Sequence, residues 1–385
     1  MTGGGGSPIL TEQAAAPRMQ ADTGSMQNKF RKLQTLTLKG FKSIRAIEEL
    51  PFADINIVLG PNGAGKSNFV GFFPFIARLA REELQDYVAK QGGIEKVLFF
   101  GPSNTSQLRV YFRSDLSEYS ATLEPTSDGG LFFANEECSV HGYGRSIGVP
   151  RQFETQLRRT DAAAEIPRYI YEPIENWRVY HFHDTSAFAP LRSLSRLTEP
   201  ERLDADGGNL AAFLYYLQEK HPDILTGVSD ALRRVAPFFG GFVLRPEALN
   251  PDTIRLRWRH RGRDPLFDVS DLSDGTLRFV ALAALLLQPD PPSTIVLDEP
   301  ELGLHPAALA ELAALMHEIA PRVQIIAATQ SPTFANHFGW RDVIMVDRVD
   351  DASTFRRLTE AEVAPWASDH GIGDMWERNL IGGRP

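Results

Sequence analysis

The segment GPNGAGKS, from Gly60 to Ser67, constrains the fold of this chain more than any other stretch. It matches the pattern G-x-x-x-x-G-K-[ST], in which glycines allow successive backbone N–H groups to curl around phosphate oxygens. The apolar run INIVLG before it predicts a buried strand, and Phe69–Leu79 after it is typical of a helix. A glycine-rich turn can match such a pattern by chance, but the strand and the helix beside it favour a phosphate-binding loop.

The residue types of this loop suit the binding of a nucleotide. Lys66 would reach the β- and γ-phosphates, and the Ser67 hydroxyl would bind Mg²⁺. The N-terminal end of the following helix adds positive potential near the phosphates. The sequence therefore predicts ATP and Mg²⁺ as cofactors, with a binding loop made of Gly60, Pro61, Asn62, Gly63, Ala64, Gly65, Lys66, Ser67 and Asn68.

A second chemical signal is the run TIVLDEP, a buried strand that ends in two carboxylates. Asp298 could hold Mg²⁺ through a water molecule, and Glu299 could accept a proton from an attacking water. Paired acids also cap strand ends without any catalytic role. Together with a phosphate-binding loop, however, the pair predicts nucleotide hydrolysis.

The segment LSDGTLR, Leu272–Arg278, lies shortly before this acidic strand. Ser273 is expected to cap the helix that follows, and Gly275 to leave the first amides of that helix open to an anion. Alone, the segment would be interpreted as a plain helix N-cap. Its place before the acidic strand favours a nucleotide contact.

Composition places the chain among ordinary globular proteins. Of its 385 residues, 43% are hydrophobic and 23% are charged, and the single cysteine excludes an internal disulfide and fits a reducing cytoplasm. The longest apolar runs, such as Phe279–Leu287, fall short of the roughly 20 residues that span a bilayer, so we expect a cytoplasmic protein without a membrane segment. The net charge of −9 argues against a surface that binds nucleic acid everywhere, but it leaves room for a local basic patch.

The order of the predicted elements indicates an α/β fold. From Asp268 onward, helices and buried strands alternate, which implies a parallel sheet. Short strands between Leu108 and Val140 predict an antiparallel β subdomain, and Arg151–Glu165 and Leu210–Leu232 have the composition of helices. We therefore expect a mixed or parallel core sheet flanked by helices, with the β subdomain and a helical insertion. The expected segments are a disordered leader (1–25), the N-terminal part of the core (26–110), an inserted β and helical region (111–265) and the C-terminal part of the core (266–385).

Together these motifs resemble the P-loop ATPase head of ABC-type proteins, in the branch of RecF and SMC rather than that of transporters. LKGFKSI at Leu38–Ile44 is similar to the opening strand of that branch, and LSDGTLR to its signature motif. LDEPELGLHP is similar to its second nucleotide motif and D-loop, and TQSP (Thr329–Pro332) to its switch. The resemblance covers about Lys32–Gly71 and Asp268–Val346.

The resemblance also implies a mechanism. Two heads pair head-to-tail as a homodimer, with ATP between the phosphate loop of one copy and Ser273 and Gly275 of the other. Gln330 stands where transporters have a histidine; it could bond to the γ-phosphate or orient water, but its charge does not change near neutral pH. Asp274 stands where transporters have a glycine, and we expect it to face away from the phosphate. The implied catalytic residues are Glu299, Gln330 and Lys66, and the implied metal ligands are Ser67 and Asp298.

Other polar residues have open interpretations. Gln91, in AKQGGIEKV, is a candidate for the lid-loop glutamine that helps to bind Mg²⁺ in this branch. His305, in GLHP, could lie at the dimer interface or could cap the helix that begins near Pro306. The segment HFHDTS superficially suggests a metal site, but no further ligand stands at metal spacing, so we expect a packed strand and loop. Its candidate ligands are His181, His183 and Asp184.

Arginine occupies every second position of the segment RLRWRHRGR. In one continuous strand, five side chains would project from a single face and could follow the phosphate backbone of DNA or RNA. The alternative is a solvated face that pairs with acids of a neighbouring strand. The five residues are Arg255, Arg257, Arg259, Arg261 and Arg263.

Three functions compete. The first is an ATP-hydrolysing switch in DNA repair or anti-phage defence; because the segment after TQSP is too short for the nuclease domain of some relatives, we expect a separate effector protein such as a nuclease. The second is a transporter subunit, which Gln330 and the long stretch between phosphate loop and signature disfavour. The third is an ATP-dependent scaffold or sensor with little hydrolysis and no direct nucleic-acid contact, although Glu299 argues against complete inactivity.

Overall fold

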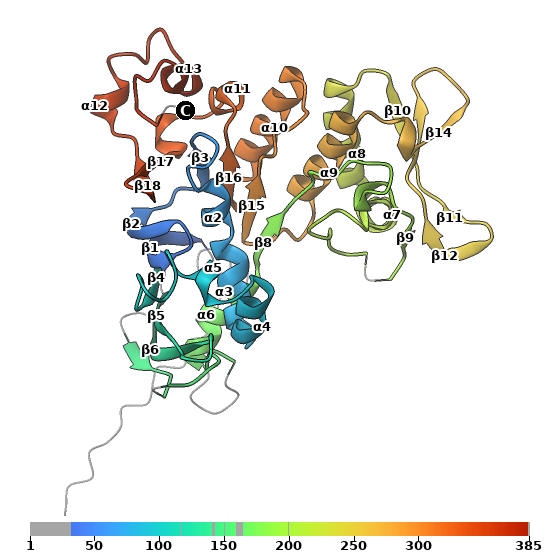
Figure 1. Ribbon diagram of the computed structural model, residues 1–385. Coiled ribbons are helices and arrows are strands. Elements are labelled where there is room, and N and C mark those ends of the chain that lie inside the picture. The colour runs from blue at the N-terminus through green and yellow to red at the C-terminus, as the bar shows by residue number, and fades with distance from the viewer. Residues whose placement is uncertain are drawn as a thin grey trace, which may run out of the picture.

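The structure, a computed structural model, describes residues 32–115, 117–140, 143–149, 151–158, 165–198 and 200–383 (Figure 1). The expected leader, residues 1–25, lies outside these described residues. The described part forms a central α/β unit, with an antiparallel sheet on one side and a helical lobe on another (Figure 1). This arrangement confirms the fold class expected from the sequence.

The centre of the molecule is a six-stranded sheet of order β18-β17-β3-β16-β15-β8. Neighbouring strands are parallel from β17 to β8, whereas β18, at one edge, is antiparallel to β17. The parallel sheet predicted from Asp268 onward is therefore confirmed, and it also includes two strands from upstream. The strands are Ile55–Leu59 (β3), Trp177–Tyr180 (β8), Thr294–Asp298 (β15), Gln324–Thr329 (β16), Val343–Val349 (β17) and Ala352–Arg357 (β18).

Alternate residues of these strands enter two separate hydrophobic cores, because successive side chains of a strand point to opposite faces. Ile57 and Leu297 belong to one core, whereas Val58 and Val296 belong to the other. Burial on both faces explains why the inner strands β3, β15 and β16 are nearly continuous apolar runs in the sequence. The first core includes α9 (Asp274–Leu287) and α10 (Pro306–Ile319), and the second includes α2 (Lys66–Val70) and α3 (Phe72–Ala80).

The antiparallel β subdomain predicted from the short strands is a second six-stranded sheet, of order β2-β1-β4-β5-β6-β7. Some strands of this sheet precede residue 110 and others follow it. The boundary expected at residue 110 therefore divides the sequence within one sheet and does not separate two sheets. The four-segment division stays a proposal. The strands are Leu33–Phe41 (β1), Ile44–Pro51 (β2), Leu108–Ser114 (β4), Ser117–Pro125 (β5), Leu131–Val140 (β6) and Tyr143–Ser146 (β7).

The prediction of a helix at Arg151–Glu165 is wrong for the described residues of this range. Residues 151–158 form turns, and the helix α6 begins only at Glu165. The reason is competition for backbone hydrogen bonds: the Arg151 N–H donates to Phe133 O (2.9 Å), and the Phe133 N–H donates to Gln152 O (2.8 Å). These groups bond to β6 instead of to a helical turn.

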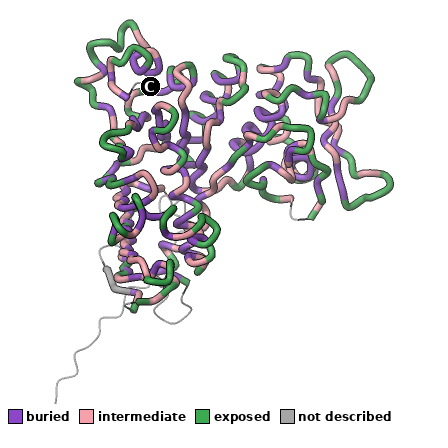
Figure 2. The backbone as a smooth tube through the Cα atoms, viewed as in Figure 1, coloured by how far each residue is buried: buried purple, intermediate pink, exposed green. Residues whose placement is uncertain are grey.

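The helical lobe carries two small sheets, of order β10-β13-β14 and β11-β12-β9, and its outer loops are mostly exposed (Figure 2). The helix expected at Leu210–Leu232 is present, but it is divided at Pro222, which begins α8 because proline suits the first helical turn. The lobe contains α7 (Leu210–Lys220), α8 (Pro222–Val235), β9 (Ser195–Arg196), β10 (Phe239–Val243), β11 (Pro246–Glu247), β12 (Asn250–Ile254), β13 (Arg257–His260) and β14 (Leu266–Asp268).

Short helices complete the described part of the chain. They are α4 (Leu84–Lys90), α5 (Ile94–Val97), α6 (Glu165–Glu175), α11 (Pro332–Ala335), α12 (Glu360–Val363) and α13 (Ile372–Glu377). Among the described residues, no helix combines the length and the apolar composition that crossing a membrane requires.

Gln324 joins the two large sheets, and this contact gives a test of the fold. Its buried amide accepts from Leu33 N (3.0 Å) and donates to Leu33 O (2.8 Å) and Ala53 O (3.0 Å). Gln324→Leu should lower the free energy of unfolding by roughly 1–3 kcal/mol, because it leaves buried backbone groups unpaired. Urea titration followed by circular dichroism measures the change. Gln218→Leu, which removes an amide with longer contacts of 3.2 and 3.4 Å, is the control, and an equal loss there would contradict the assignment.

Candidate functional site

The glycine-rich loop lies between β3 and α2 and packs against the backbone of β17 and the Ser353 side chain of β18. Gly65 has a φ of 109°, in the left-handed region, and a Cβ atom there would lie 2.0 Å from Ser353 Oγ. A Cβ atom at Gly60 would lie 2.4 Å from Val346 O. Only glycine fits both positions, because any other residue would clash with these neighbours.

Lys66 folds back onto the loop. Its Nζ donates to the carbonyl oxygens of Gly60 (2.8 Å) and Pro61 (3.0 Å). Burial lowers the pKa of Lys66, and the carboxylates that follow β15 oppose this shift. The candidate phosphate-binding cation therefore lies within the electrostatic field of the candidate acidic residues.

The motif LKGFKSI packs directly beside the loop. Asn68 Nδ2 donates to Ser43 Oγ (2.8 Å), which lies 2.7 Å from Ser353 Oγ. Ser67 is exposed at the start of α2, as are Asn62 and the glycine that follows it, whereas Ala64 is buried. The tertiary structure therefore brings the opening strands and the glycine-rich loop together.

The acidic pair lies at the carboxyl end of β15. Glu299 has a φ of 43°, a left-handed conformation that is uncommon outside glycine, and its N–H donates to Ala328 O of β16 (2.8 Å). Gln330 Nε2 donates to Glu299 Oε1 (3.2 Å). The candidate base and the candidate switch residue are therefore in direct contact.

Glu301 is a third carboxylate at this place, and the sequence reasoning missed it. It accepts hydrogen bonds from Thr329 Oγ1 (2.5 Å) and from Gln330 N (3.4 Å). Burial raises the pKa of Glu301. The only local signal was a second glutamate two residues after the acidic pair, in LDEPEL.

The arrangement around Asp298 suits a hydrated cation. Its Oδ1 atom is buried and has no hydrogen-bond partner among the described residues, and an unpaired buried carboxylate oxygen is costly. The described ranges contain no group of three or more His, Cys, Asp or Glu side chains that could hold a metal by themselves. Mg²⁺ does not require one, because it commonly takes one or two carboxylates together with waters and substrate phosphates. Asp298 therefore fits the role of a ligand to hydrated Mg²⁺, and the role of Ser67 stays a prediction.

Ser273 caps α9, as predicted: its side chain accepts from the Thr276 N–H (3.2 Å). Gly275 has a packing role that the sequence reasoning did not foresee. A Cβ atom there would lie 2.4 Å from Gly303 O, so the missing side chain lets α9 contact the loop that follows the acidic pair. The signature segment and this loop are therefore in direct backbone contact.

Arg192 neutralises the unusual acid of the signature. Its side chain, only 10% exposed, forms an ion pair with Asp274 (2.7 Å) and also donates to Val269 O (2.8 Å) and Leu272 O (3.3 Å). Sequence reasoning missed Arg192, because nothing in its local context marks it. The expectation that Asp274 points away from a phosphate gains a physical basis, since the carboxylate turns toward this guanidinium.

The remaining polar candidates have modest roles. Gln91 Oε1 accepts from Lys42 Nζ (3.1 Å) at the C-terminus of α4. His305 is the N-cap of α10 and accepts from Ala307 N (3.3 Å), which confirms the helix-cap interpretation. The strand of the expected strand and loop is β8, which ends at Tyr180, and HFHDTS is the loop that follows it. Phe182 is buried in this loop, whereas His181 and Asp184 are exposed, and the described residues contain no metal cluster.

The prediction of one continuous basic strand is wrong. β12 ends at Ile254 and β13 begins at Arg257, because the chain leaves one small sheet there and enters the other. Arg257 is paired with Glu247 (2.7 Å), as in the ion-paired alternative, but Glu247 lies on β11 of the other small sheet and not on a strand beside β13. A second pair, at 3.9 Å, joins Arg255 to a carboxylate of β14. The exposed basic residues are Arg259, Arg261 and Arg263.

The contact between Gly275 and Gly303 gives a test of the site. Gly275→Ala should lower the free energy of unfolding by about 1–3 kcal/mol, because the added methyl group overpacks the contact. Gly227→Ala is a matched control within α8, where a Cβ atom would lie 3.7 Å from Leu287 and helix propensity should add about 0.5–1 kcal/mol. Urea titration measures both changes, and a gain of stability in Gly275→Ala would contradict the close packing.

Known proteins resemble both the sequence and the motifs. A family described as "AAA domain, putative AbiEii toxin, Type IV TA system" matches residues 156–336, which include the signature, the acidic pair and the switch. The OLD nuclease of Thermus scotoductus is 23% identical over 351 residues, 83% of this chain and 63% of that protein. The chromosome partition protein Smc of Mycobacterium tuberculosis is 40% identical over 98 residues, 24% of this chain and 8% of that protein. The chain thus spans less than two thirds of the length of these relatives.

The fold also has solved counterparts. The crystal structure of an Smc head bound to the C-winged helix domain of ScpA superposes with a TM-score of 0.60 and 17% identity, over 86% of this chain and 99% of that chain. At this identity the likeness concerns the fold. The fold and the relatives together agree with the resemblance of the motifs to an ABC-type ATPase head of the SMC and RecF-like branch.

Proposed function

We propose that the protein is an ATP-hydrolysing switch whose two copies pair around ATP. The observation that carries this proposal is the contact between Gln330 and Glu299 (3.2 Å), within the electrostatic reach of Lys66. A base, a group that can orient water and a phosphate-binding cation come from three separate segments and meet at one edge of the sheet. Such a combination favours a reaction centre over a purely structural ion cluster.

In the proposed reaction, water attacks the γ-phosphorus of ATP, the bond to the β–γ bridging oxygen breaks, and ADP and phosphate leave. Glu299 accepts the proton of the attacking water, while Gln330 orients that water. Lys66 exchanges the carbonyls of its own loop for oxygens of the β- and γ-phosphates. Mg²⁺, held by Ser67 and Asp298, would neutralise charge on the phosphates.

The second copy is proposed to complete the site with Ser273 and Gly275. Ser273 is exposed at the N-terminus of α9, where backbone N–H groups and the helix dipole favour an anion. The ion pair between Asp274 and Arg192 supports this role, because it offsets the charge that would repel a γ-phosphate. ATP would then hold two heads together, and hydrolysis would release them.

The proposed setting is DNA repair or defence against phage, with a separate effector such as a nuclease. The support is the similarity to the OLD nuclease over 83% of this chain. An ATP-dependent scaffold or sensor with little hydrolysis is the alternative. The contact between Gln330 and Glu299 favours hydrolysis, because a scaffold needs no base beside its switch residue.

Nucleic acid is the proposed ligand of a groove of about 430 Å³ beside β13. Arg259, Arg261 and Arg263 line it with one carboxylate, Asp264, and no ion pair to these three arginines forms within the described ranges. Arg259 pairs with Gly241 on the neighbouring strand, and a Cβ atom at Gly241 would have nothing within 4 Å, so the groove is open at this point. Unpaired guanidinium groups in an open groove suit the phosphates of DNA or RNA.

The ATPase assignment is tested by Glu299→Gln. This variant should lower the rate of phosphate release by about 10²–10⁴, because the base is lost while the shape is kept. It should still bind ATP and form an ATP-dependent dimer, as measured by light scattering. Lys66→Ala is the companion variant, and it should lose ATP binding.

Three outcomes would contradict this assignment. Hydrolysis at the wild-type rate in Glu299→Gln would place the base elsewhere. Unchanged ATP affinity in Lys66→Ala would remove the phosphate-loop interpretation. Normal ATP binding and dimerisation without hydrolysis in the wild-type protein would select the scaffold.

The groove is tested by the double charge reversal Arg259→Glu and Arg261→Glu. Affinity for labelled single-stranded DNA, duplex DNA or RNA should fall at least tenfold, and the slope of log affinity against log salt should become shallower by about 2, because two phosphate contacts are lost. The control is the same reversal at Arg109 and Arg113, which are exposed on β4. An equal loss in the control, or no binding by the wild-type protein, would contradict the proposal.

A further inference from the structure

The carbonyl of Asp298 lies at the end of β15, just beyond the point where the neighbouring strand β8 stops pairing with it. β8 accompanies β15 as far as the pair Tyr180 and Leu297. The chain then turns away, and the N–H of His181 donates to Ala205 O (2.9 Å) instead of to β15. β8 therefore supplies no further backbone partner for the Asp298 carbonyl, just where the candidate catalytic residues begin.

The side chain of His183 takes the place of the missing backbone donor. Its Nε2 atom lies 2.6 Å from Asp298 O. A carbonyl oxygen can only accept a hydrogen bond, so Nε2 must carry the proton in this contact. One imidazole thus continues the hydrogen bonding of the sheet by one residue beyond its last backbone pair.

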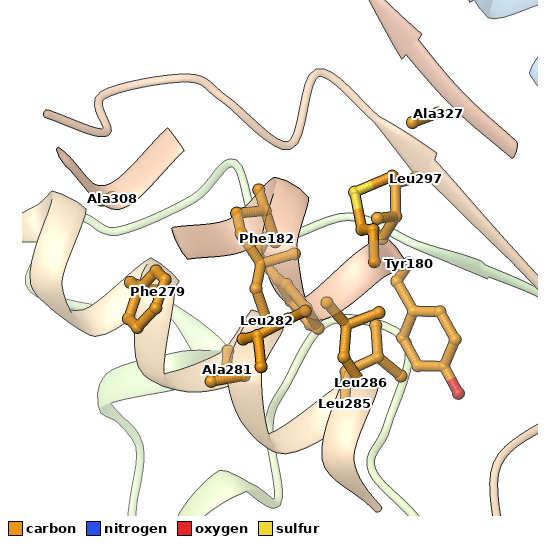
Figure 3. Packing of buried hydrophobic residues seen from close by; sticks show 14 of the residues in the cluster. Tyr180, Phe182, Phe279, Ala281, Leu282, Leu285, Leu286, Leu297, Ala308 and Ala327 are labelled. Carbon is orange, nitrogen blue, oxygen red and sulfur yellow. The ribbon is translucent and has the colours of Figure 1, made fainter. Parts of the chain in front are cut away.

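His183 is itself held from two directions. Arg278, on the signature helix, donates to His183 O (2.9 Å) and to Phe182 O (2.7 Å). Phe182 is buried in the core between α9 and β15, among residues such as Leu282 and Leu297 (Figure 3). The imidazole therefore approaches the acidic strand end from a fixed segment and not from a free loop.

The peptide group that His183 holds sets the direction of Glu299. The N–H of Glu299 is bound to Ala328 O (2.8 Å), and the carbonyl on the other side of the same peptide is bound to His183. Glu299 itself has a left-handed φ of 43°, a conformation that persists where the surroundings fix it. With this peptide fixed on both sides, the carboxylate can meet Gln330.

We propose that His183 is a positioning residue for the acidic pair, acting through the Asp298 carbonyl. The inference rests on the proposed function, because it takes Asp298 and Glu299 as the metal ligand and the base. His183 does not touch the nucleotide; it supplies one N–H donor at the ε position. A glutamine can place an amide N–H near that position, whereas a leucine of similar size cannot.

The test compares His183→Leu with His183→Gln. His183→Leu should lower kcat for ATP hydrolysis by about 10–100-fold, the usual effect of losing a group that orients a metal ligand, with KM for ATP changed less than about threefold. His183→Gln should recover most of this loss. A structural role alone would not separate kcat from KM and would not be rescued by the amide.

The matched control is His317→Leu. His317 Nε2 also bonds to a backbone carbonyl, that of His337 (3.2 Å), but on α10. This variant should keep kcat within about twofold of the wild type, because its imidazole holds no residue of the acidic pair. Equal kcat values in His183→Leu and His183→Gln, or no loss in His183→Leu, would overturn the inference.

A second readout does not depend on hydrolysis. Hydrogen exchange of residues 298–302 in the nucleotide-free protein should be faster in His183→Leu than in the wild type or in His183→Gln, while β3 stays unchanged. If wild-type protein and Glu299→Gln show the same turnover, the proposed function fails, and the exchange result still decides whether His183 holds this peptide. Unchanged exchange in His183→Leu would refute the positioning role even in an active ATPase.

Discussion

The parallel register of β3, β16 and β15 is the constraint on which the candidate site depends. Leu59 pairs with Thr329, and Ala328 pairs with Asp298, so the three strands end at one edge of the sheet. The proposed phosphate loop, the proposed base and the proposed switch residue are the groups that follow these strand ends. A slip of one residue would turn the apolar side chains of a strand to the wrong core and would also separate these groups. Folding of the two cores and assembly of the site are therefore the same event.

The site gathers more negative charge than the chain itself compensates. Asp298 and Glu301 each have a buried carboxylate oxygen without a hydrogen-bond partner among the described residues. Lys66 donates hydrogen bonds to two carbonyls of its own loop. Burial raises the pKa of Glu301 and lowers that of Lys66, so both charged forms are disfavoured. A nucleotide with its cation would satisfy these groups, which is why we interpret the place as a binding site and not as a structural ion cluster.

Close backbone contacts connect this edge of the sheet to the signature helix. Gly275 meets Gly303 without a side chain between them, and Arg278 donates to carbonyls on both sides, including Leu302 O. The same guanidinium holds His183, which contacts Asp298. Packed interiors transmit small shifts. A displacement of the signature segment should therefore also displace the loop after the acidic pair and the end of β15.

The amino-acid sequence alone predicted the glycine-rich loop, the buried strand that ends in acids, the N-cap Ser273 and the parallel α/β fold, because each is marked by a pattern of neighbouring residues. It failed where partners are distant: Arg192 reaches Asp274 across 82 positions, and His183 reaches Asp298 across 115. It also failed for the arginine run, because alternation is a local pattern, whereas the change from one small sheet to another between Ile254 and Arg257 is set by packing of the whole lobe. Which charges are paired follows from the folded structure alone, since pairing depends on distance in space and not along the chain.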